Sequence, residues 1–303
     1  MDLLISYLKR SSVINQSENM ALNALIKMLD EPDERTFNLI REKICSYGND
    51  AITPLEKIFD STFVSMVQER ISDIMETIRM NQANRDFSDW VKYGSSDLLK
   101  GYLLVNKTQF PGTNDGVLTK QIEQMKMDIW LELNENLTAL ENVKVMNHIF
   151  FSIHHFEGNK FNPGDPQHSY LNILLETHKG NPLSIGILYL ILAQKLKLPL
   201  AGVNLPRHFI LAYLTESAIP FSTAEDVLFY INPFNEGAVF TRREIELFIH
   251  QSKIKPEISF FAPCTNLEII QRLIQNLKSA YQRLGESDKI NSLESFLTIL
   301  EGT

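Results

Sequence analysis

The chain is poor in cysteine and has no long apolar run. Its 303 residues include only Cys45 and Cys264 as cysteines. Two cysteines are too few for the disulfide framework of a small secreted domain, which favours a reducing compartment. The longest largely apolar run, Leu183 to Ala193, is much shorter than the about 20 residues that a membrane span needs. We therefore expect a soluble, cytoplasmic protein that makes no use of a membrane.

An excess of basic residues is also missing. The chain has 29 lysines and arginines against 37 acidic residues, a net charge of -8. This balance lacks the basic patch of a nucleic-acid-binding domain, so we expect no nucleic-acid partner. The sequence has no phosphate loop or dinucleotide fingerprint, so we expect no cofactor. His154 and His155 lie near Glu157, but neighbouring side chains point in different directions, and we predict no metal site.

Residues 1–92 have the pattern of a helical domain. Apolar residues recur at helical spacing, and the pattern breaks at Asp30–Asp33 and at Gly48-Asn49. A fourth helix is predicted over Phe63–Met80. Short helices joined by tight turns are typical of a HEAT-like stack.

Residues 93–257 are predicted to form an α+β core with a helical lead-in. The expected helices are Trp90–Val105, Val117–Leu133, Leu137–His154, Ser169–His178 and one beginning near Pro182. Period-two segments rich in Val, Ile, Phe and Tyr then predict the strands Leu200–Leu205, His208–Leu214, Val227–Ile231 and Ala238–Thr241. The expected fold class is α+β: predominantly helical, with a small antiparallel sheet packed on a central helix. Residues 258–303 are predicted to form a TPR-like helical hairpin.

The order of helix and strands from Asn172 to Tyr213 is the layout in which papain-like enzymes place a nucleophile and a base. Those enzymes have a cysteine at the helix start, where the macrodipole stabilises a thiolate. Here the helix start reads Gly180-Asn181-Pro182-Leu183-Ser184, without a cysteine. Acyl transfer needs a nucleophile, a base and a group that orients the base. Ser184, His208 and Asn232 occur in that order and are the candidate catalytic residues.

Each of these three residues also has a structural interpretation. Ser184 has the residue type of a first-turn or capping residue, and no G-x-S-x-G nucleophile motif occurs. His208 suits a hydrogen-bonded structural histidine, and Asn232 before Pro233 suits a strand-ending turn. Asn181, Arg207 and His178 are the candidate binding residues at the same cleft.

Cys264 lies at another predicted helix start, where its pKa could be lowered. It follows the histidine in the chain, which is the wrong order for this layout. We predict instead that Thr265 and Glu268 form a capping box there.

The chain resembles the SirB-type transglutaminase-like proteins from about Lys100 to Leu284. The motifs that carry this resemblance are Phe156-Glu-Gly-Asn159, Ser169-Tyr170-Leu171, Gly180-Asn181-Pro182-x-Ser184, Leu198-Pro199-Leu200, Gly202-Val203-Asn204-Leu205-Pro206-x-His208-Phe209 and Asn232-Pro233-Phe234-x-x-Gly237. The resemblance implies a papain-like transglutaminase core in a family that commonly lacks the catalytic cysteine. This chain departs from the family pattern at Asn232, where the family has Asp, and at Arg207, where the family has Gly.

Three functions are open at this point. The leading hypothesis is a non-catalytic transglutaminase-like protein, a pseudoenzyme that binds a protein or peptide. The second is a hydrolase or acyltransferase that uses Ser184, His208 and Asn232. The third is a scaffold in which the helical repeat alone binds a partner.

Overall fold

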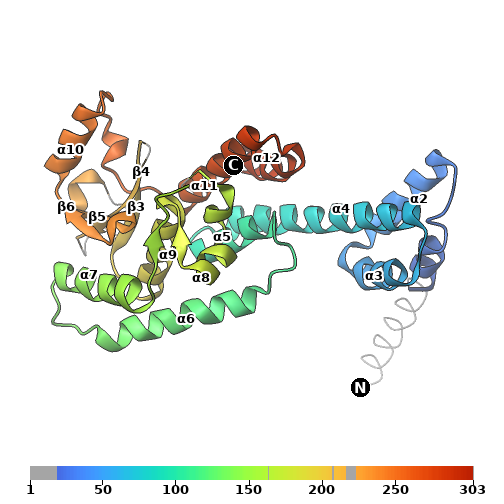
Figure 1. Cartoon of the computed structure of the whole chain (residues 1–303), viewed down its shortest axis with the longest axis horizontal. Helices are drawn as coiled ribbons and strands as arrows, with labels where there is room; N and C mark the ends of the chain where they lie inside the picture. The colour runs from blue at the N-terminus through green and yellow to red at the C-terminus, as the bar shows by residue number, and fades with distance from the viewer. Residues whose placement is uncertain (1–18, 163, 207, 216–222, 303) are drawn as a thin grey trace, which may run out of the picture. The chain divides into compact units, whose positions relative to one another are not determined.

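The computed structural model describes residues 19–162, 164–206, 208–215 and 223–302 of the chain. The chain divides into two compact units, Met1–Asp86 and Phe87–Thr303 (Figure 1). The domain boundaries expected from the sequence, at 92/93 and 257/258, stay predictions.

The first unit is helical in its described part. Its helices are residues 19–26, α2 (Glu34–Ser46), α3 (Ile52–Ser61) and α4 (Ser65–Asp89), of which the last three residues belong to the second unit. Asp33 caps α2 by accepting a hydrogen bond from the N–H of Thr36 at 2.8 Å. Arg70 donates to the carbonyls of Leu29 and Glu31, at 2.9 and 2.8 Å, and so fixes the turn before α2. Aliphatic side chains fill the core between these helices, among them Leu22, Ile26, Ile44, Leu55, Ile71 and Ile74.

Two predicted helices on either side of residue 90 had wrong ends. The predicted helix over Phe63–Met80 is α4, which continues to Asp89 because residues 81–89 contain no glycine or proline. The predicted helix Trp90–Val105 is two segments, a π-helical turn η2 (Trp90–Gly94) and α5 (Leu98–Lys107). The break is fixed by Asp97, which caps α5 and whose carbonyl accepts from the Trp90 indole at 2.8 Å.

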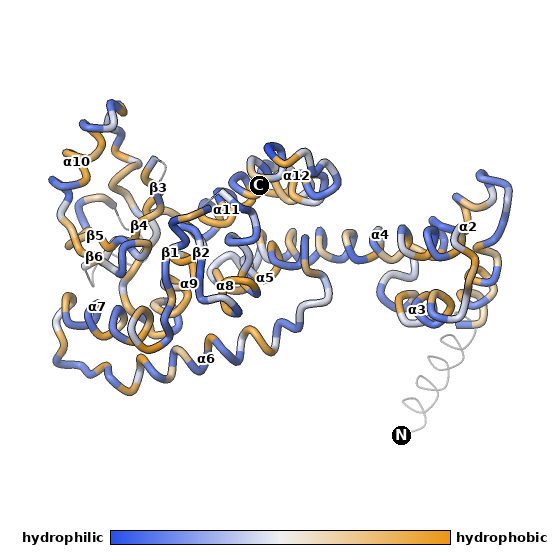
Figure 2. The backbone as a smooth tube through the Cα atoms, viewed as in Figure 1, coloured by the Kyte–Doolittle hydropathy of each residue, from blue (hydrophilic) through white to orange (hydrophobic). Residues whose placement is uncertain are grey.

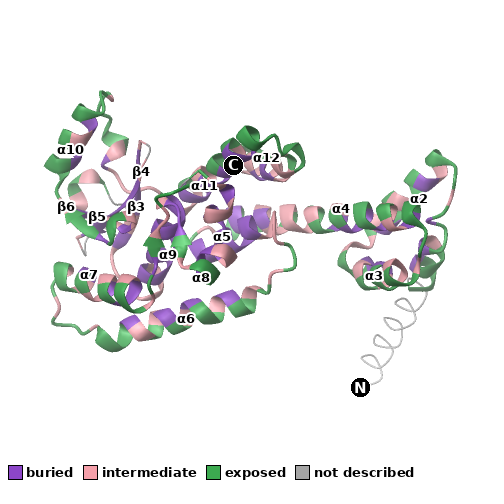
Figure 3. Cartoon of the chain, viewed as in Figure 1, coloured by how far each residue is buried: buried purple, intermediate pink, exposed green. Residues whose placement is uncertain are grey.

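The remaining helices that precede the core belong to the second unit. They are α6 (Asp115–Glu132), α7 (Ala139–Asn147) and a second π-helical segment η3 (His148–Ile153), where one helix was predicted over Leu137–His154. Along α6 hydrophobic and hydrophilic residues alternate (Figure 2), and so do buried and exposed ones (Figure 3). Its buried side is made by Leu118, Ile122, Met125 and Ile129, as expected of an amphipathic helix.

The helix α9 (Pro182–Lys195) is the centre of the second unit. Every residue from Leu183 to Ala193 is buried, which fits a helix that is apolar on all sides. The chain reaches it through η4, α8 and a two-stranded parallel pair, β1 with β2. Their bounds are Glu157–Gly158 for β1, Pro166–Ser169 for η4, Leu171–Thr177 for α8 and Lys179–Gly180 for β2.

An antiparallel sheet packs on α9 in the strand order β3-β4-β5-β6. Its strands are β3 (Leu200–Leu205), β4 (His208–Leu214), β5 (Val227–Asn232) and β6 (Ala238–Phe240). On one face the ring of Phe209 lies against Gly186 of α9, so closely that a Cβ there would collide with it. On the other face Ile210 packs with Ile245 and Ile249 of α10 (Arg242–Gln251). The predicted α+β class, with a small antiparallel sheet on a central helix, is confirmed.

Short 3-10 segments and a helical hairpin complete the unit. The segments are η6 (Ala224–Asp226), η7 (Pro233–Asn235) and η8 (Ile258–Phe260), and the hairpin helices are α11 (Asn266–Leu284) and α12 (Ser287–Glu301). The capping box of Thr265 and Glu268 at the start of α11 is confirmed. The hydroxyls of Tyr170 and Tyr281 lie 2.9 Å apart and join α11 to the residue that precedes α8. None of the helices described is both long and apolar enough to cross a bilayer.

Candidate functional site

The candidate site is a cavity of about 530 Å³ beside the start of α9. Pro182 and Leu183 line it from α9, and His208 and Phe209 line it from β4. The polar wall opposite is formed by α11. Elements far apart in the sequence therefore meet at the point where a papain-like enzyme would carry its nucleophile and base.

Asn181 caps the start of α9. Its side-chain oxygen accepts hydrogen bonds from the N–H groups of Leu183 and Ser184, at 3.0 and 2.9 Å. Its amide nitrogen donates to the hydroxyl of Ser169 at 2.7 Å. Asn181 lines the cavity, but these bonds make it a buried helix cap. The N–H groups of Leu183 and Ser184 are consequently occupied and are not available to stabilise an oxyanion.

Ser184, the predicted nucleophile, is fully buried. Its hydroxyl donates to the backbone carbonyl of His168 at 2.7 Å, with the carbonyl of Asn181 also at 3.2 Å. Leu183, one residue earlier, lines the cavity that holds His208, whereas Ser184 does not. The structure does not bring Ser184 to His208. The cause is helix rotation, because successive residues differ by about 100° around the helix axis.

His208, the predicted base, is the first residue of β4 and is half-buried. Its ring meets the ring of Phe248 of α10 edge-on, with centroids 5.0 Å apart and an interplanar angle of 83°. Burial, and secondarily the positive charge of Arg272, lower the pKa of His208. The imidazole is thus held in its neutral form down to lower pH than a free histidine.

Asn232, the predicted orienting residue, shares a second cavity of about 220 Å³ with His208, on the α10 side of the sheet. Its side-chain oxygen accepts from the N–H of Phe234 at 3.1 Å and starts the turn η7. In the described part of the chain no hydrogen bond joins Asn232 to the His208 ring. The two residues line the same cavity, but Asn232 acts here as a turn residue.

Of the other two predicted binding residues only His178 is described, and it does not line the main cavity. His178 ends α8 in the left-handed conformation, and its ring stacks on Phe156 with centroids 4.8 Å apart. It has the position of a structural histidine. Arg207 lies outside the described residues.

Arg272 is the residue of this site that the sequence did not reveal. It lies on α11 and donates to the side-chain oxygen of Asn204 at 2.9 Å. It also donates to the carbonyls of Leu205 and His208, at 3.2 and 2.9 Å. Arg272 therefore holds the end of β3 to the start of β4 and fixes the backbone of His208. A sequence signal existed in the polar spacing of Arg272, Asn276, Ser279 and Arg283, which places them on one face of a helix.

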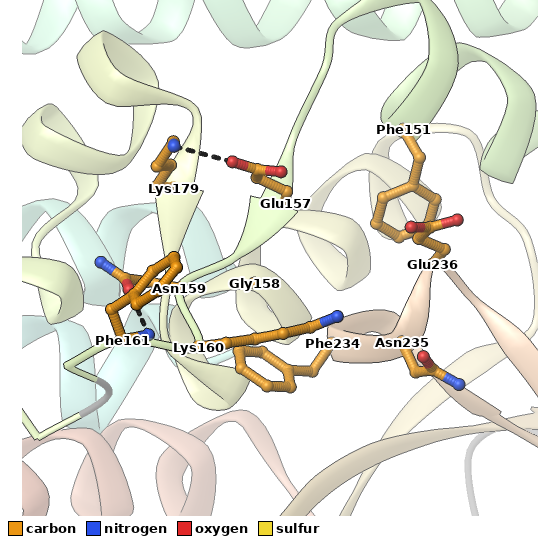
Figure 4. A pocket seen from close by; sticks show the side chains of 10 residues that line it. All are labelled: Phe151, Glu157, Gly158, Asn159, Lys160, Phe161, Lys179, Phe234, Asn235 and Glu236. Atoms are coloured by element: carbon orange, nitrogen blue, oxygen red, sulfur yellow. Dashed lines mark hydrogen bonds and ion pairs between the residues drawn. The ribbon is translucent and has the colours of Figure 1, made fainter.

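A smaller pocket of about 140 Å³ shares Lys160 and Phe234 with the main cavity. Figure 4 shows the Lys160 side chain lying along the Phe234 ring. The floor is formed by β1 and β2, whose ends are joined by the ion pair of Lys179 with Glu157 at 2.8 Å. Phe234 packs on Gly158 so closely that a Cβ there would collide with the ring. Among the described residues, no group of three or more His, Cys, Asp or Glu side chains is placed to hold a metal ion.

Residues 117–275, more than half of the chain, match the Transglutaminase-like superfamily. This segment includes α9, the sheet and Arg272. Two similar curated proteins are both named UPF0162 protein. The one from Xylella fastidiosa (strain 9a5c) is 24% identical over 204 residues, which cover 63% of this chain and 67% of that protein.

The second, from Vibrio cholerae serotype O1, is 25% identical over 209 residues, covering 67% of this chain and 71% of that protein. The chain is also similar to F-box only protein 21 of Homo sapiens. That similarity is 27% identity over 154 residues, which cover 51% of this chain and 24% of the human protein. No solved structure matches the chain significantly.

Proposed function

The chain belongs to the Transglutaminase-like superfamily, and we propose that it is a non-catalytic member that binds a protein or peptide segment in the main cavity. The SirB-type motifs of the sequence, including Gly202–Phe209 and Asn232–Gly237, belong to this proposal. We also propose that the protein is cytoplasmic, which the two unpaired cysteines, Cys45 and Cys264, support.

The position of Leu183 carries this proposal. A nucleophile must lie within hydrogen-bond reach of its base. At the start of α9, the residues that line the cavity together with His208 are Pro182 and Leu183, whose side chains have no nucleophilic atom. The hydroxyl of Ser184 is buried against the carbonyl of His168. This geometry favours binding over acyl transfer.

The cavity itself suits a peptide ligand. Its volume of about 530 Å³ is within the usual range of ligand sites. Pro182, Leu183, Phe209 and Phe234 give it an apolar side, and α11 gives it a polar side. A peptide presents both kinds of surface, through its side chains and its backbone.

Chemical labelling tests the non-catalytic part of the proposal. We expect a serine-directed acylating probe such as a fluorophosphonate to leave the folded chain unlabelled. The His208→Ala variant should behave in the same way. Labelling at Ser184 that disappears in His208→Ala would overturn the proposal and restore the hydrolase hypothesis.

Peptide selection tests the binding part. A random peptide library displayed on phage would be selected against the full chain. Selected peptides would then be measured on Ser279→Trp, which fills the cavity from α11, and on Gln275→Trp, an exposed residue of α11 outside the lining. We expect at least tenfold weaker binding to Ser279→Trp only. Equal binding to both variants would place the peptide elsewhere, as the scaffold hypothesis requires.

A further inference from the structure

The helix α11 has two different sides. Its apolar side, with Ile269, Leu273 and Leu277, is buried in the core of the unit. Its polar side, with Arg272, Asn276, Ser279 and Arg283, lines the main cavity at successive spacings of four, three and four residues. Such spacings keep side chains on one face of a helix. The cavity therefore has a basic residue toward each end of its polar wall.

Arg272 is a half-buried cation, and no acidic side chain among the described residues pairs with it. Its three acceptors are the side-chain oxygen of Asn204 and the carbonyls of Leu205 and His208, and all are neutral. No ion pair reaches it from any described residue. A buried charge without a counter-charge costs free energy. Burial accordingly lowers the pKa of Arg272. An anion arriving in the cavity would offset this cost.

The exposed rim of the cavity is also basic. Lys160 and Arg283 both line it, and in the described part of the chain neither makes an ion pair. Asp165 is the acidic residue of the lining, and its carboxylate already accepts from the N–H of Gln167 at 2.9 Å. Three cations against one engaged carboxylate make a local positive site on a chain whose net charge is -8.

From these observations we propose that the cavity binds an acidic peptide segment in extended conformation, with one carboxylate at Arg272 and a second at Arg283 and Lys160. This inference rests on the proposed function. Arg272 and Arg283 are 11 residues apart on α11, about 16 Å along a helix axis. One carboxylate cannot bridge that distance, whereas an extended segment of about five residues spans it. An apolar residue between the two acidic residues would pack on Leu183 and Phe234.

Matched pentapeptides test this assignment. The probes are fluorescein-labelled Glu-Ala-Phe-Ala-Glu amide and the same peptide with both Glu replaced by Gln, measured by fluorescence anisotropy on the full chain. We expect the Glu peptide to bind at least tenfold more tightly, because each carboxylate forms charge-assisted hydrogen bonds. Arg283→Gln and Lys160→Gln should each weaken the Glu peptide several-fold without affecting the Gln peptide. The control Lys120→Gln, an exposed lysine of α6, removes the same charge and should change neither.

The outcomes separate this inference from the proposed function. Equal affinity for both peptides, with both lost in Ser279→Trp, would overturn the acidic assignment and leave peptide binding in place. An equal loss of affinity for the Glu peptide in Lys120→Gln and Arg283→Gln would also overturn it, because the attraction would then depend on net charge and not on the cavity. If neither these peptides nor any library peptide binds, both proposals are wrong.

A separate measurement addresses Arg272, which also holds the β3–β4 turn and whose removal affects folding. A carboxylate at Arg272 would offset the positive charge that helps to lower the pKa of His208. We expect the His208 ring signal, followed by NMR, to titrate at higher pH with saturating Glu peptide than with Gln peptide. An unchanged titration would place the carboxylate away from Arg272 and overturn that contact.

Discussion

The hydroxyl of Ser184 donates a hydrogen bond to the backbone carbonyl of His168 at 2.7 Å, and the side chain is completely buried. The adjacent Leu183 lines the cavity that contains His208. Both residues are buried, but only Leu183 borders the cavity. Whether this fold can carry a nucleophile is thus a question about position 183, not about position 184.

Cysteine substitution at the two positions should separate them. We expect the thiol of Leu183→Cys to react with iodoacetamide near neutral pH. This buried position borders the cavity, the smaller cysteine leaves more of the cavity open, and a helix N-terminus lowers a thiol pKa. The thiol of Ser184→Cys should react at least tenfold more slowly, because it is enclosed by protein. Peptide mapping by mass spectrometry would assign each modification and distinguish it from Cys45 and Cys264. Equal rates at the two positions would contradict the orientation of α9.

Gly237 makes a second testable contact. It has a φ of 71°, and a Cβ there would collide with the side chain of Asn147. Asn147 donates to the Gly237 carbonyl at 3.0 Å and accepts from the Tyr189 hydroxyl at 2.9 Å, so it ties the β5–β6 turn to α7 and α9. We expect Gly237→Ala to lower the free energy of unfolding by about 2–4 kcal/mol.

Gly285 supplies the matched control for that substitution. It also has a positive φ, 76°, but no heavy atom lies within 4 Å of an added Cβ. Gly285→Ala should lower the free energy of unfolding by only about 1–2 kcal/mol, which is the strain of a left-handed backbone conformation. Chemical denaturation followed by tryptophan fluorescence reports on the second unit, because Trp90 and Trp130 both belong to it. Equal costs at the two glycines would show that the contact with Asn147 contributes nothing.

The lowered pKa of His208 predicts a pH dependence of stability. Burial and Arg272 keep the folded imidazole neutral, while the unfolded histidine takes up a proton below its ordinary pKa of about 6.5. The contribution of His208 to the free energy of unfolding is therefore complete above that pH. It decreases as the pH falls from there toward the lower pKa of the folded state. Its slope is at most about 1.4 kcal/mol per pH unit.

Denaturation of the wild type and of His208→Gln at a series of pH values measures this contribution. The variant should lose part of the decrease in stability on acidification. His250→Gln, at an exposed position of α10, controls for the removal of an imidazole. Parallel pH profiles for wild type and His208→Gln would contradict the environment assigned to His208.

The strands and several helix starts could be predicted because their signals are local. Segments rich in apolar, strand-forming residues predicted Leu200–Leu205 and His208–Leu214, which are the observed bounds of β3 and β4. The pattern of Thr265 followed by Glu268 predicted the capping box of α11, and both of its side-chain bonds form. Such signals act within a few residues, so the sequence contains them directly.

The site itself depends on contacts that are distant in the chain. The direction of Ser184 is set by the carbonyl of His168, and a rotation of one residue exchanges Ser184 for Leu183 in the cavity. Arg272 reaches the carbonyl of His208 from a helix 64 residues later. The polar spacing from Arg272 to Arg283 predicts one face of a helix, but it does not predict which backbone carbonyl Arg272 reaches, and nothing local predicts the bond from Ser184 to His168. The order of Ser184, His208 and Asn232 therefore predicted the fold better than it predicted their contacts.

Cys264 gives a last test, because its place just before a helix start and its surroundings lead to opposite expectations. A cysteine close to a helix N-terminus often has a lowered pKa. Here the backbone N–H of Cys264 donates to the carbonyl of Gly202 at 2.8 Å, which seats the residue against the edge strand β3. Burial, and then the charge of Glu268, raise the pKa of the Cys264 thiol to about 12. Burial also raises the pKa of Cys45.

We therefore expect both thiols of the folded chain to react slowly with Ellman's reagent at pH near 8, since the thiolate is the reactive form. Denaturant should release both at the rate of a free thiol. Leu183→Cys provides the positive control, with one additional thiol that reacts in the folded state. Rapid modification of Cys264 in the folded protein, located by mass spectrometry, would mean that the dipole of α11 outweighs the burial of the thiol.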